Sequence, residues 1–440
     1  MVKLTRLKIN QYRNVRPGTE LHFDDGVNLV LGQNGSGKTT LLGLLSCVIG
    51  SDLSPLQNEP FDLEYDIVGG DFTASVHIEA DPQRELLDDP ESIRRAENPA
   101  RDQPAFSYRF VISSEASSAT CEITGTPEGT TVVESELPAN LKIHPISPVR
   151  RGFFHEALDE LVHTSRFSEP SLGFYVHLVA RFDESLDAFL AMTGRPVVTA
   201  SAGTPPTARL NVSHFPKRFT HATLRQFVPK SLFSLVPVAH ESIAGEIRVS
   251  TADADSDSTE GPQIMSFLLN AAKAMGFTAA AMKPEIKATR TTVTARQFEV
   301  EGFTFNFTRR DGSTIHHDLL SYGQKRLLAY YYYLASTEHV VIADELVNGL
   351  HHRWIEACMA AIGERQAFLT SQNPLLFEYV RFESIEQVQR CFVTCKTEIV
   401  DGAEQLVWQN MPRPDAISFF ESYKADIESV GDILITRGLW

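Results

Sequence analysis

Residues 32–39 read Gly32-Gln33-Asn34-Gly35-Ser36-Gly37-Lys38-Thr39 and form a complete GxxxxGK(S/T) pattern. The pattern follows the apolar run 27–31, which is typical of a buried strand, and precedes the Leu-rich segment 39–49, which predicts a helix. Glycines in such a turn let main-chain N–H groups surround phosphate oxygens, and the helix N-terminus adds its dipole. A chance glycine-rich turn would not need both flanks, so the stretch predicts a phosphate-binding loop.

The residue types in this loop predict which groups hold a nucleotide. Lys38 is expected to contact the β- and γ-phosphates, and the Thr39 hydroxyl is expected to bind Mg²⁺. The other candidate nucleotide contacts are Gly32, Asn34, Gly35, Ser36, Gly37 and Thr40.

A second pattern, Val340-Val341-Ile342-Ala343-Asp344-Glu345, is an apolar strand that ends in two carboxylates. Asp344 is expected beside the metal ion, and Glu345 is placed to polarise an attacking water as the catalytic base. Alone, the pattern fits an ordinary solvated strand end. Together with the glycine-rich loop it favours nucleotide hydrolysis.

A third pattern is Leu319-Leu320-Ser321-Tyr322-Gly323-Gln324-Lys325-Arg326, in which a Ser-x-Gly turn opens a helix. Basic residues are unfavourable in the first turn of a helix, so Lys325 and Arg326 indicate a nearby anion. Because residues 32–39 already hold one phosphate chain, we interpret this turn as a site for the nucleotide of another subunit.

The order of these three patterns resembles the ABC-type ATPases, in the branch that holds SMC, RecF and the OLD-like ATPases of bacterial defence. Residues 344–351 look like that branch's DExxNxLHP run, and residues 369–374 look like its switch strand. The resemblance covers about 1–80 and 295–380. It implies Walker A and Walker B motifs, ATP and Mg²⁺ as cofactors, and an active dimer. In that dimer ATP lies between the P-loop of one head and Ser321, Gly323 and Gln324 of the other.

The sequence departs from the family pattern at the catalytic switch position, where Gln372 replaces a histidine. Glutamine keeps a hydrogen-bonding side chain but cannot accept a proton as imidazole does. We therefore expect slow hydrolysis. His352 also replaces the proline that is usual after Leu-His.

Composition places the chain among ordinary globular proteins. Of 440 residues, 42% are apolar and 22% charged, which excludes a disordered or low-complexity chain. The net charge of -16 gives a global field that repels nucleic acid. No apolar run is long enough to span a membrane, so we expect a cytoplasmic protein without a membrane partner.

The predicted fold class is α/β: an ABC-type P-loop ATPase head with an antiparallel β subdomain and an inserted, mainly helical lobe. The expected domains are residues 1–148 and 262–440 for the two parts of the head, and 149–261 for the lobe. Hairpins are expected from 61–68 with 72–78 and from 298–308 with 313–317. Helices within the lobe are expected at 155–163 and 173–192.

Two other features are interpreted as packing. Tyr330 to Tyr333 suggest a base-stacking platform, but four consecutive helical residues point in nearly all directions. We therefore expect them to be buried beneath the signature helix. The five cysteines are expected to be core thiols rather than metal ligands, because only Cys391 and Cys395 lie close together in sequence.

The basic tract, residues 188–240, contains no Asp or Glu and six basic residues. Such an island focuses a local field, which favours a polyanionic partner, either nucleic acid or an acidic protein. Docking against the acidic head is the nearly equal alternative. The basic residues are Arg195, Arg209, Lys217, Arg218, Arg225 and Lys230.

The predicted function is an ATP-binding and hydrolysing enzyme that forms a homodimer around ATP. By analogy with the resembled family, we expect a sensor or scaffold of a bacterial anti-phage system that acts with a separately encoded effector protein. One alternative is a RecF- or SMC-like ATPase that binds DNA in repair. The other is a nucleotide-gated scaffold with little hydrolysis.

Overall fold

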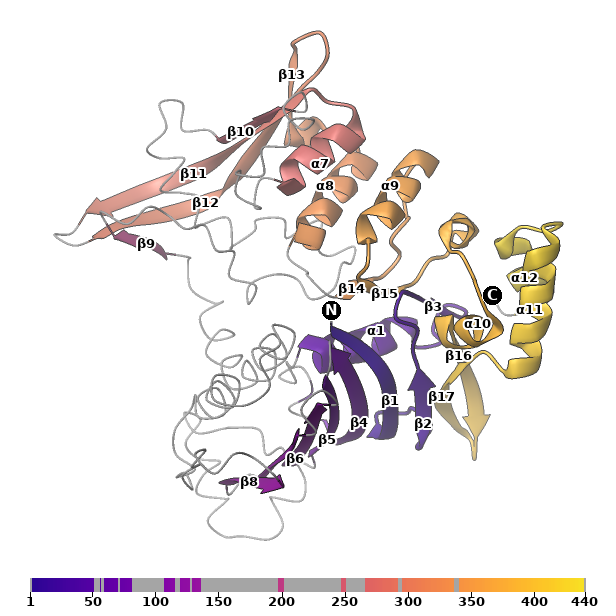
Figure 1. Cartoon of the computed structure of the whole chain (residues 1–440). Helices are drawn as coiled ribbons and strands as arrows, with labels where there is room; N and C mark the ends of the chain where they lie inside the picture. The colour runs from indigo at the N-terminus through magenta and orange to yellow at the C-terminus, as the bar shows by residue number, and fades with distance from the viewer. Residues whose placement is uncertain are drawn as a thin grey trace. The chain divides into compact units, whose positions relative to one another are not determined.

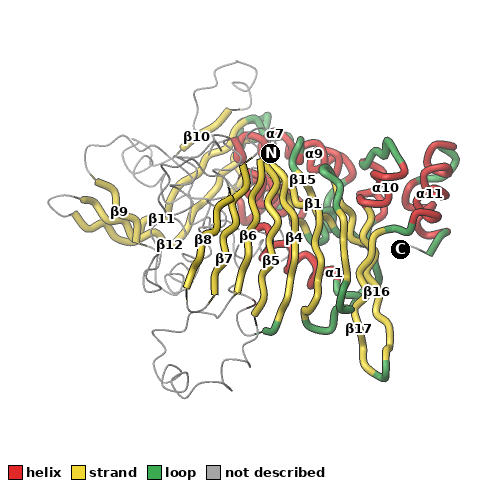
Figure 2. Tube along the Cα trace, turned by 60° about the horizontal axis from the view of Figure 1, so that its bottom comes forward, coloured by secondary structure: helices red, strands yellow, loops and turns green. Residues whose placement is uncertain are grey.

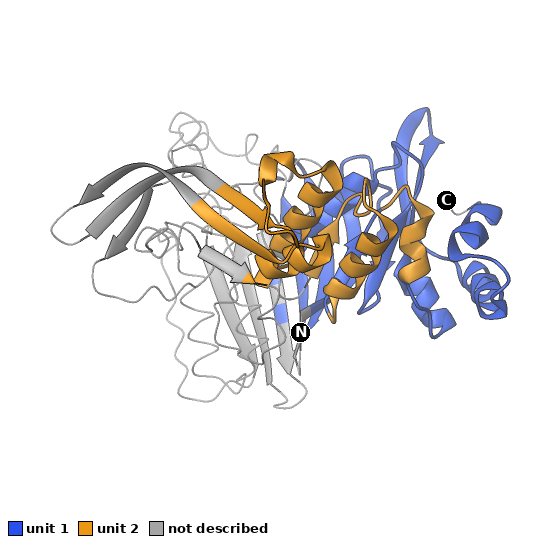
Figure 3. Cartoon of the chain, turned by 90° about the horizontal axis from the view of Figure 1, so that it is seen from above, with its two compact units in different colours: residues 1–189, 365–370, 380–440 blue, residues 190–364, 371–379 orange. Residues whose placement is uncertain are grey.

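The computed structural model describes residues 2–50, 56, 59–69, 72–80, 107–114, 119–126, 129–135, 197–201, 247–250, 266–291, 295–335 and 340–438. The chain divides into two compact units (Figure 3). The first unit comprises residues 1–189, 365–370 and 380–440, and the second comprises residues 190–364 and 371–379.

The first unit contains an antiparallel sheet in the order β2-β1-β4-β5-β6-β7-β8, whose strands lie side by side in Figure 2. In β4, apolar Leu63 and Tyr65 are buried while Asp62 and Glu64 are partly exposed, a period of two that one buried sheet face requires. The strands are β1 (Val2–Tyr12), β2 (Thr19–His22), β4 (Phe61–Gly69), β5 (Phe72–Ala80), β6 (Ser107–Ser114), β7 (Ala119–Thr126) and β8 (Gly129–Ser135).

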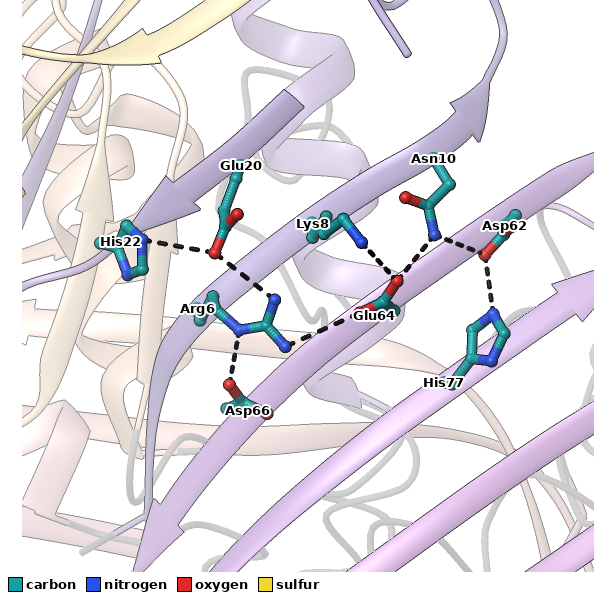
Figure 4. A network of polar contacts seen from close by, with 9 residues as sticks. All are labelled: Arg6, Lys8, Asn10, Glu20, His22, Asp62, Glu64, Asp66 and His77. Atoms are coloured by element: carbon teal, nitrogen blue, oxygen red, sulfur yellow. Dashed lines mark hydrogen bonds and ion pairs between the residues drawn. The ribbon is translucent and has the colours of Figure 1, made fainter. Parts of the chain in front are cut away.

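A polar network covers part of the other face of this sheet (Figure 4). Arg6 Nε lies 2.6 Å from Asp66 Oδ2, and Lys8 Nζ lies 2.7 Å from Glu64 Oε1. The hydrogen bond from Lys8, followed by that from Asn10, lowers the pKa of Glu64. Ion pairs near solvent contribute about 0–1 kcal/mol each. These partly exposed pairs therefore keep the face polar more than they stabilise the fold. The network joins Arg6, Lys8, Asn10, Glu20, His22, Asp62, Glu64, Asp66 and His77.

A second group of strands in the first unit runs in the order β15-β3-β16-β17. Strand β3 is parallel to both neighbours, and β16 and β17 form an antiparallel hairpin. The buried Gln366 amide exchanges hydrogen bonds of 2.9 and 2.8 Å with the main chain of Leu4, which connects β15 to β1. The elements are β3 (Val27–Leu31), β15 (Gln366–Leu369), β16 (Phe392–Val400), β17 (Ala403–Asn410), α1 (Lys38–Gly50), α10 (Ile385–Cys391), α11 (Arg413–Ala425) and α12 (Val430–Thr436).

The second unit combines an antiparallel sheet, β10-β11-β12-β13 with β9 on β12, and several helices (Figure 1). Phe267 of α7 packs edge-on against Phe305 of β12 and Tyr332 of α8, which joins the sheet to the helices. The strands are β9 (Val197–Ser201), β10 (Ile247–Ser250), β11 (Ala279–Thr291), β12 (Ala295–Thr308), β13 (Thr314–His316) and β14 (Val340–Ala343). The helices are α7 (Ser266–Met275), α8 (Tyr322–Ala335) and α9 (His352–Ile362), with 3-10 helices η8 (His317–Leu319) and η9 (Pro374–Tyr379).

Both predicted hairpins are confirmed: β4 pairs with β5, and β12 pairs with β13. Several elements were not predicted, among them β11, α9 and α10. The sequence of β11 is rich in Ala and Lys and contains Pro284, so its strand propensity is low, and pairing with β12 along its length stabilises it instead.

The predicted lobe, residues 149–261, is described only at β9 and β10, and the helices expected at 155–163 and 173–192 lie outside the described residues. The domain limits at 148 and 261 stay predictions. In the part of the chain that the structure describes, no helix is long and apolar enough to cross a membrane.

Candidate functional site

The P-loop, residues 32–39, connects the end of β3 to the start of α1. The predicted strand, turn and helix are therefore present in that order. Lys38 Nζ donates hydrogen bonds to the carbonyl oxygens of Gly32, at 2.7 Å, and Gln33, at 3.0 Å. The ammonium group thus folds back onto the loop and holds its first two residues.

Close packing against the β16–β17 hairpin explains two of the loop glycines. Gly37 has φ 85°, and a Cβ atom there would lie 2.8 Å from Leu406 Cδ1 and 3.2 Å from Trp408 Nε1. A Cβ atom on Gly32 would collide with the carbonyl oxygen of Cys395. The hairpin therefore supports the loop from behind and permits only glycine at these two positions.

The P-loop contains a buried hydroxyl without a hydrogen-bond partner, and such a group indicates whether a phosphate fits the loop. Ser36 is 4% exposed, and its Oγ atom has no hydrogen-bond partner. A buried hydroxyl without a partner costs about 1–3 kcal/mol, and a phosphate oxygen would supply the missing acceptor. Asn34, Gly35 and Thr39 are exposed, and the Thr39 hydroxyl is an oxygen ligand of the kind that Mg²⁺ prefers. The residues present therefore fit a nucleotide phosphate with its metal ion.

The acidic turn, residues 344–350, follows the buried residues of β14. Asp344 and Glu345 are both partly exposed at its start, and Glu345 has the left-handed φ of 53°. Glu345 Oε2 accepts a hydrogen bond of 3.1 Å from the main-chain N–H of Gln372. The structure thus brings together Glu345 and Gln372, and this contact uses the main chain of Gln372.

The signature turn, residues 321–324, starts α8 with a reciprocal cap. Ser321 Oγ accepts from Gln324 N at 3.3 Å, and Ser321 N donates to Gln324 Oε1 at 2.9 Å. Gly323 is needed within the chain itself, because a Cβ atom there would lie 2.6 Å from the carbonyl oxygen of Gly349 and 3.0 Å from the Trp354 ring. Ser321 is exposed and Gly323 is buried.

The two basic residues after this turn have main-chain partners, which corrects the inference of an anion beside both. Lys325 Nζ donates to the carbonyl oxygen of Asp318 at 2.9 Å. Arg326 is fully buried and donates to the carbonyl oxygens of Asp344, Glu345 and Leu346. The sequence could have indicated that Arg326 is buried, because it lies four and seven residues before the buried Tyr330 and Tyr333 and so shares their helix face.

The candidate site residues are divided between the two units. Gly32, Asn34, Gly35, Ser36, Gly37, Lys38, Thr39 and Thr40 belong to the first unit. Ser321, Gly323, Gln324, Asp344, Glu345 and Gln372 belong to the second.

Within the described residues, two further groups place three possible metal-ligand atoms within 4.8 Å of one another. Both groups are joined by pairs between their own members, as in His316 Nδ1 and Asp318 Oδ2 at 3.2 Å and in His77 Nε2 and Asp62 Oδ1 at 2.8 Å. The groups are His316, His317 and Asp318, and Asp62, His77 and Glu79.

The burial expected for the tyrosines and the cysteines is confirmed for the described residues, except at Tyr331, which is half-buried. Tyr330, Tyr332 and Tyr333 are buried, and the Tyr330 hydroxyl donates to the carbonyl oxygen of Cys358 at 3.1 Å. Burial raises the pKa of the Cys395 thiol to about 12. The buried thiols are those of Cys47, Cys358, Cys391 and Cys395. The basic tract lies outside the described residues except for 197–201.

A strand, a glycine-rich phosphate-binding loop and a following helix define a P-loop nucleotide-binding protein. The family model described as "AAA domain, putative AbiEii toxin, Type IV TA system" matches residues 27–378, which is most of the chain. The chain therefore belongs to this family and is an ABC-type P-loop ATPase of the SMC and RecF branch.

Other similarities are more limited. The DNA replication and repair protein RecF of Shewanella woodyi is 54% identical over 41 residues, which are 9% of this chain and 11% of RecF. The SMC head bound to the C-winged helix domain of ScpA has 11% identity and a TM-score of 0.36 over 93% of this chain and 98% of that one. The SMC head domain from Thermotoga maritima has 9% identity and a TM-score of 0.34 over 93% and 99%. Both TM-scores are low, so the family assignment rests on the sequence match.

Proposed function

We propose that this protein binds ATP with Mg²⁺ at the P-loop, hydrolyses it, and pairs with a second copy around the nucleotide. The observation that carries the proposal is the buried Ser36 hydroxyl, which lacks an acceptor in a loop that is already shaped for phosphate. A glycine-rich turn with a purely structural role has no reason to bury an unsatisfied hydroxyl.

Each residue of the site has a role in this proposal. Lys38 contacts the β- and γ-phosphates, while Thr39 and Asp344 hold Mg²⁺, which would neutralise charge that develops on the phosphates. Glu345 accepts a proton from the attacking water. Gln372 orients that water or contacts the γ-phosphate through its amide.

Pairing is proposed because the start of α8 has the properties of an anion site that faces solvent. Ser321 is exposed and its hydroxyl caps the helix, whose dipole favours negative charge at this end. Ser321, Gly323 and Gln324 would thus meet the nucleotide that a second copy holds. The active unit is then a homodimer with two composite sites.

We further propose that the dimer is the sensor or scaffold of a bacterial defence system and acts with a separately encoded effector. The family description as a putative toxin of a toxin–antitoxin system supports a defensive role. The RecF match favours a second candidate, a DNA-binding repair ATPase. Nucleic acid or an acidic protein at the basic tract stays a prediction. DNA-stimulated turnover would favour the repair function, and co-purification of an effector would favour the sensor.

The composite site is tested by mixing two inactive variants. Lys38→Ala removes the phosphate-binding charge, and Ser321→Asp places a carboxylate where the partner's phosphates would lie. Asp is as good an N-cap as Ser, so this change keeps the start of the helix. Ser321→Asn is the matched control, because it caps the helix without adding charge.

We expect each inactive variant alone to show almost no ATPase activity. Their equimolar mixture should recover about a quarter of the parental rate, since half of randomly paired dimers are mixed and each mixed dimer has one intact site. Ser321→Asn should retain ATP-dependent dimers by light scattering. No recovery on mixing, with both variants folded, would refute the composite site.

A further inference from the structure

The environment of Arg326 is unusual for a charged side chain. It is fully buried in α8, a position at which an ion is costly unless it is paired or hydrogen-bonded. Its partners are main-chain carbonyl oxygens, with Nε 3.2 Å from Leu346 O and Nη2 3.4 Å from Asp344 O, besides its bond to Glu345 O. Burial lowers the pKa of Arg326, and the nearby Tyr322 and Glu345 oppose that shift.

The turn that these bonds hold is itself unfavourable. Glu345 has φ 53°, a left-handed conformation that costs a residue with a Cβ atom about 1–2 kcal/mol. Within the turn, Asn348 N donates to the carbonyl oxygen of Glu345 at 3.2 Å. The guanidinium bond to that same carbonyl therefore opposes the tendency of the turn to relax.

Arg326 also lies next to the signature turn. Tyr322 lies one helical turn before Arg326, and its side chain is near enough to the guanidinium to oppose the lowering of the Arg326 pKa. The Tyr322 ring is in turn packed on Gly349 of the acidic turn, where a Cβ atom would lie 2.6 Å from Tyr322 Cε1. Signature turn, Arg326 and Glu345 thus form one contiguous set of contacts within the second unit.

We infer that Arg326 is a positioning residue: its guanidinium holds the acidic turn so that the Glu345 carboxylate stays in place, and through Tyr322 it ties this turn to the signature turn. The inference rests on the proposed function, in which Glu345 is the base. Ligand contact at the signature turn of one copy would then be felt at Glu345 of the same copy. Arg326 need not touch nucleotide to affect turnover.

The test is the turnover of Arg326→Met, which keeps an unbranched buried side chain and removes all the donors. A misplaced catalytic group costs up to about a hundredfold in rate, so we expect kcat to fall by about that factor while ATP affinity stays within about twofold. Arg326→Lys keeps the charge and a donating ammonium group in place of the guanidinium fork, and it should recover part of the loss. If Arg326→Met does not fold, the turnover of Arg326→Lys is compared with that of the parent instead.

Tyr330→Phe is the matched control. It removes a buried donor to the carbonyl of Cys358 one turn further along the same helix, away from the acidic turn. Its kcat should stay close to the parental value. Equal losses in Tyr330→Phe and Arg326→Met would show a general packing effect and overturn the inference.

A double-variant cycle separates this inference from the proposed function. If Arg326 acts through Glu345, adding Arg326→Met to Glu345→Gln should slow turnover no further. Additive losses would overturn the positioning role. Parental turnover in Glu345→Gln alone would instead refute Glu345 as the base and with it the proposed function at this residue.

Discussion

Replacing Glu345 by Gln changes the charge of the site and little else. Gln keeps an oxygen that can accept the 3.1 Å hydrogen bond from Gln372 N. The bonds from Arg326 end on main-chain carbonyls, so they do not depend on the charge of residue 345. The acidic turn should therefore keep its conformation, and only proton acceptance is lost.

This loss sets the magnitude of the expected effect. General-base catalysis contributes about 10²- to 10⁴-fold, so Glu345→Gln should raise the barrier to hydrolysis by about 3–5 kcal/mol. ATP binding should persist because Lys38, Thr39 and the P-loop main chain are unchanged. Since bound ATP is then consumed slowly, ATP-bound dimers should accumulate.

Single-turnover phosphate release at saturating ATP measures the chemical step, and equilibrium binding of a fluorescent ATP analogue measures affinity. Glu356→Gln, which neutralises an exposed carboxylate on α9, is the control and should behave as the parent. Hydrolysis by Glu345→Gln at the parental rate would refute the assignment of the base. A parallel loss of nucleotide binding would show that the turn had not kept its structure.

Two further substitutions test other parts of the site. Gln372→His should retain or raise kcat, because the imidazole can accept a proton and the main-chain bond to Glu345 is unaffected; a collapse of turnover in a folded variant would contradict the switch role. Gly37→Ala should destabilise the protein by about 1–3 kcal/mol more than Gly35→Ala in urea unfolding, because both have φ 85° but only Gly37 meets Leu406 and Trp408. Equal losses would show that the hairpin does not restrict the loop.

The local features were predictable from sequence because their causes are local. The P-loop needs its glycines within eight residues, and the hairpin of β4 and β5 shows the alternation of one buried face. For Tyr330 and Tyr333, helical geometry argued against one stacking face, and packing was the remaining interpretation. In each case the residues that determine the structure lie next to one another in the chain.

The remaining features depend on partners that are distant in sequence. Gly323 was predicted as a nucleotide contact, but its lack of a side chain also makes room for the carbonyl of Gly349 and for Trp354. The start of α9 was missed, although His351 caps it by accepting from Arg353 N at 3.4 Å. Such contacts appear only when the fold brings the segments together, so no sequence period reports them.

The position of Gln372 makes one departure from the family pattern compatible with the proposed function. Glu345 binds the main-chain N–H of residue 372, and that group is the same for glutamine and histidine. The substitution therefore leaves the placement of the proposed base unchanged and alters only what the side chain itself can offer to water or phosphate. Because Arg326 holds the other side of the same turn, the conformation of Glu345 depends on main-chain groups at both of its contacts. Turnover should then be more sensitive to residue 326, which holds the base, than to the identity of the side chain at 372.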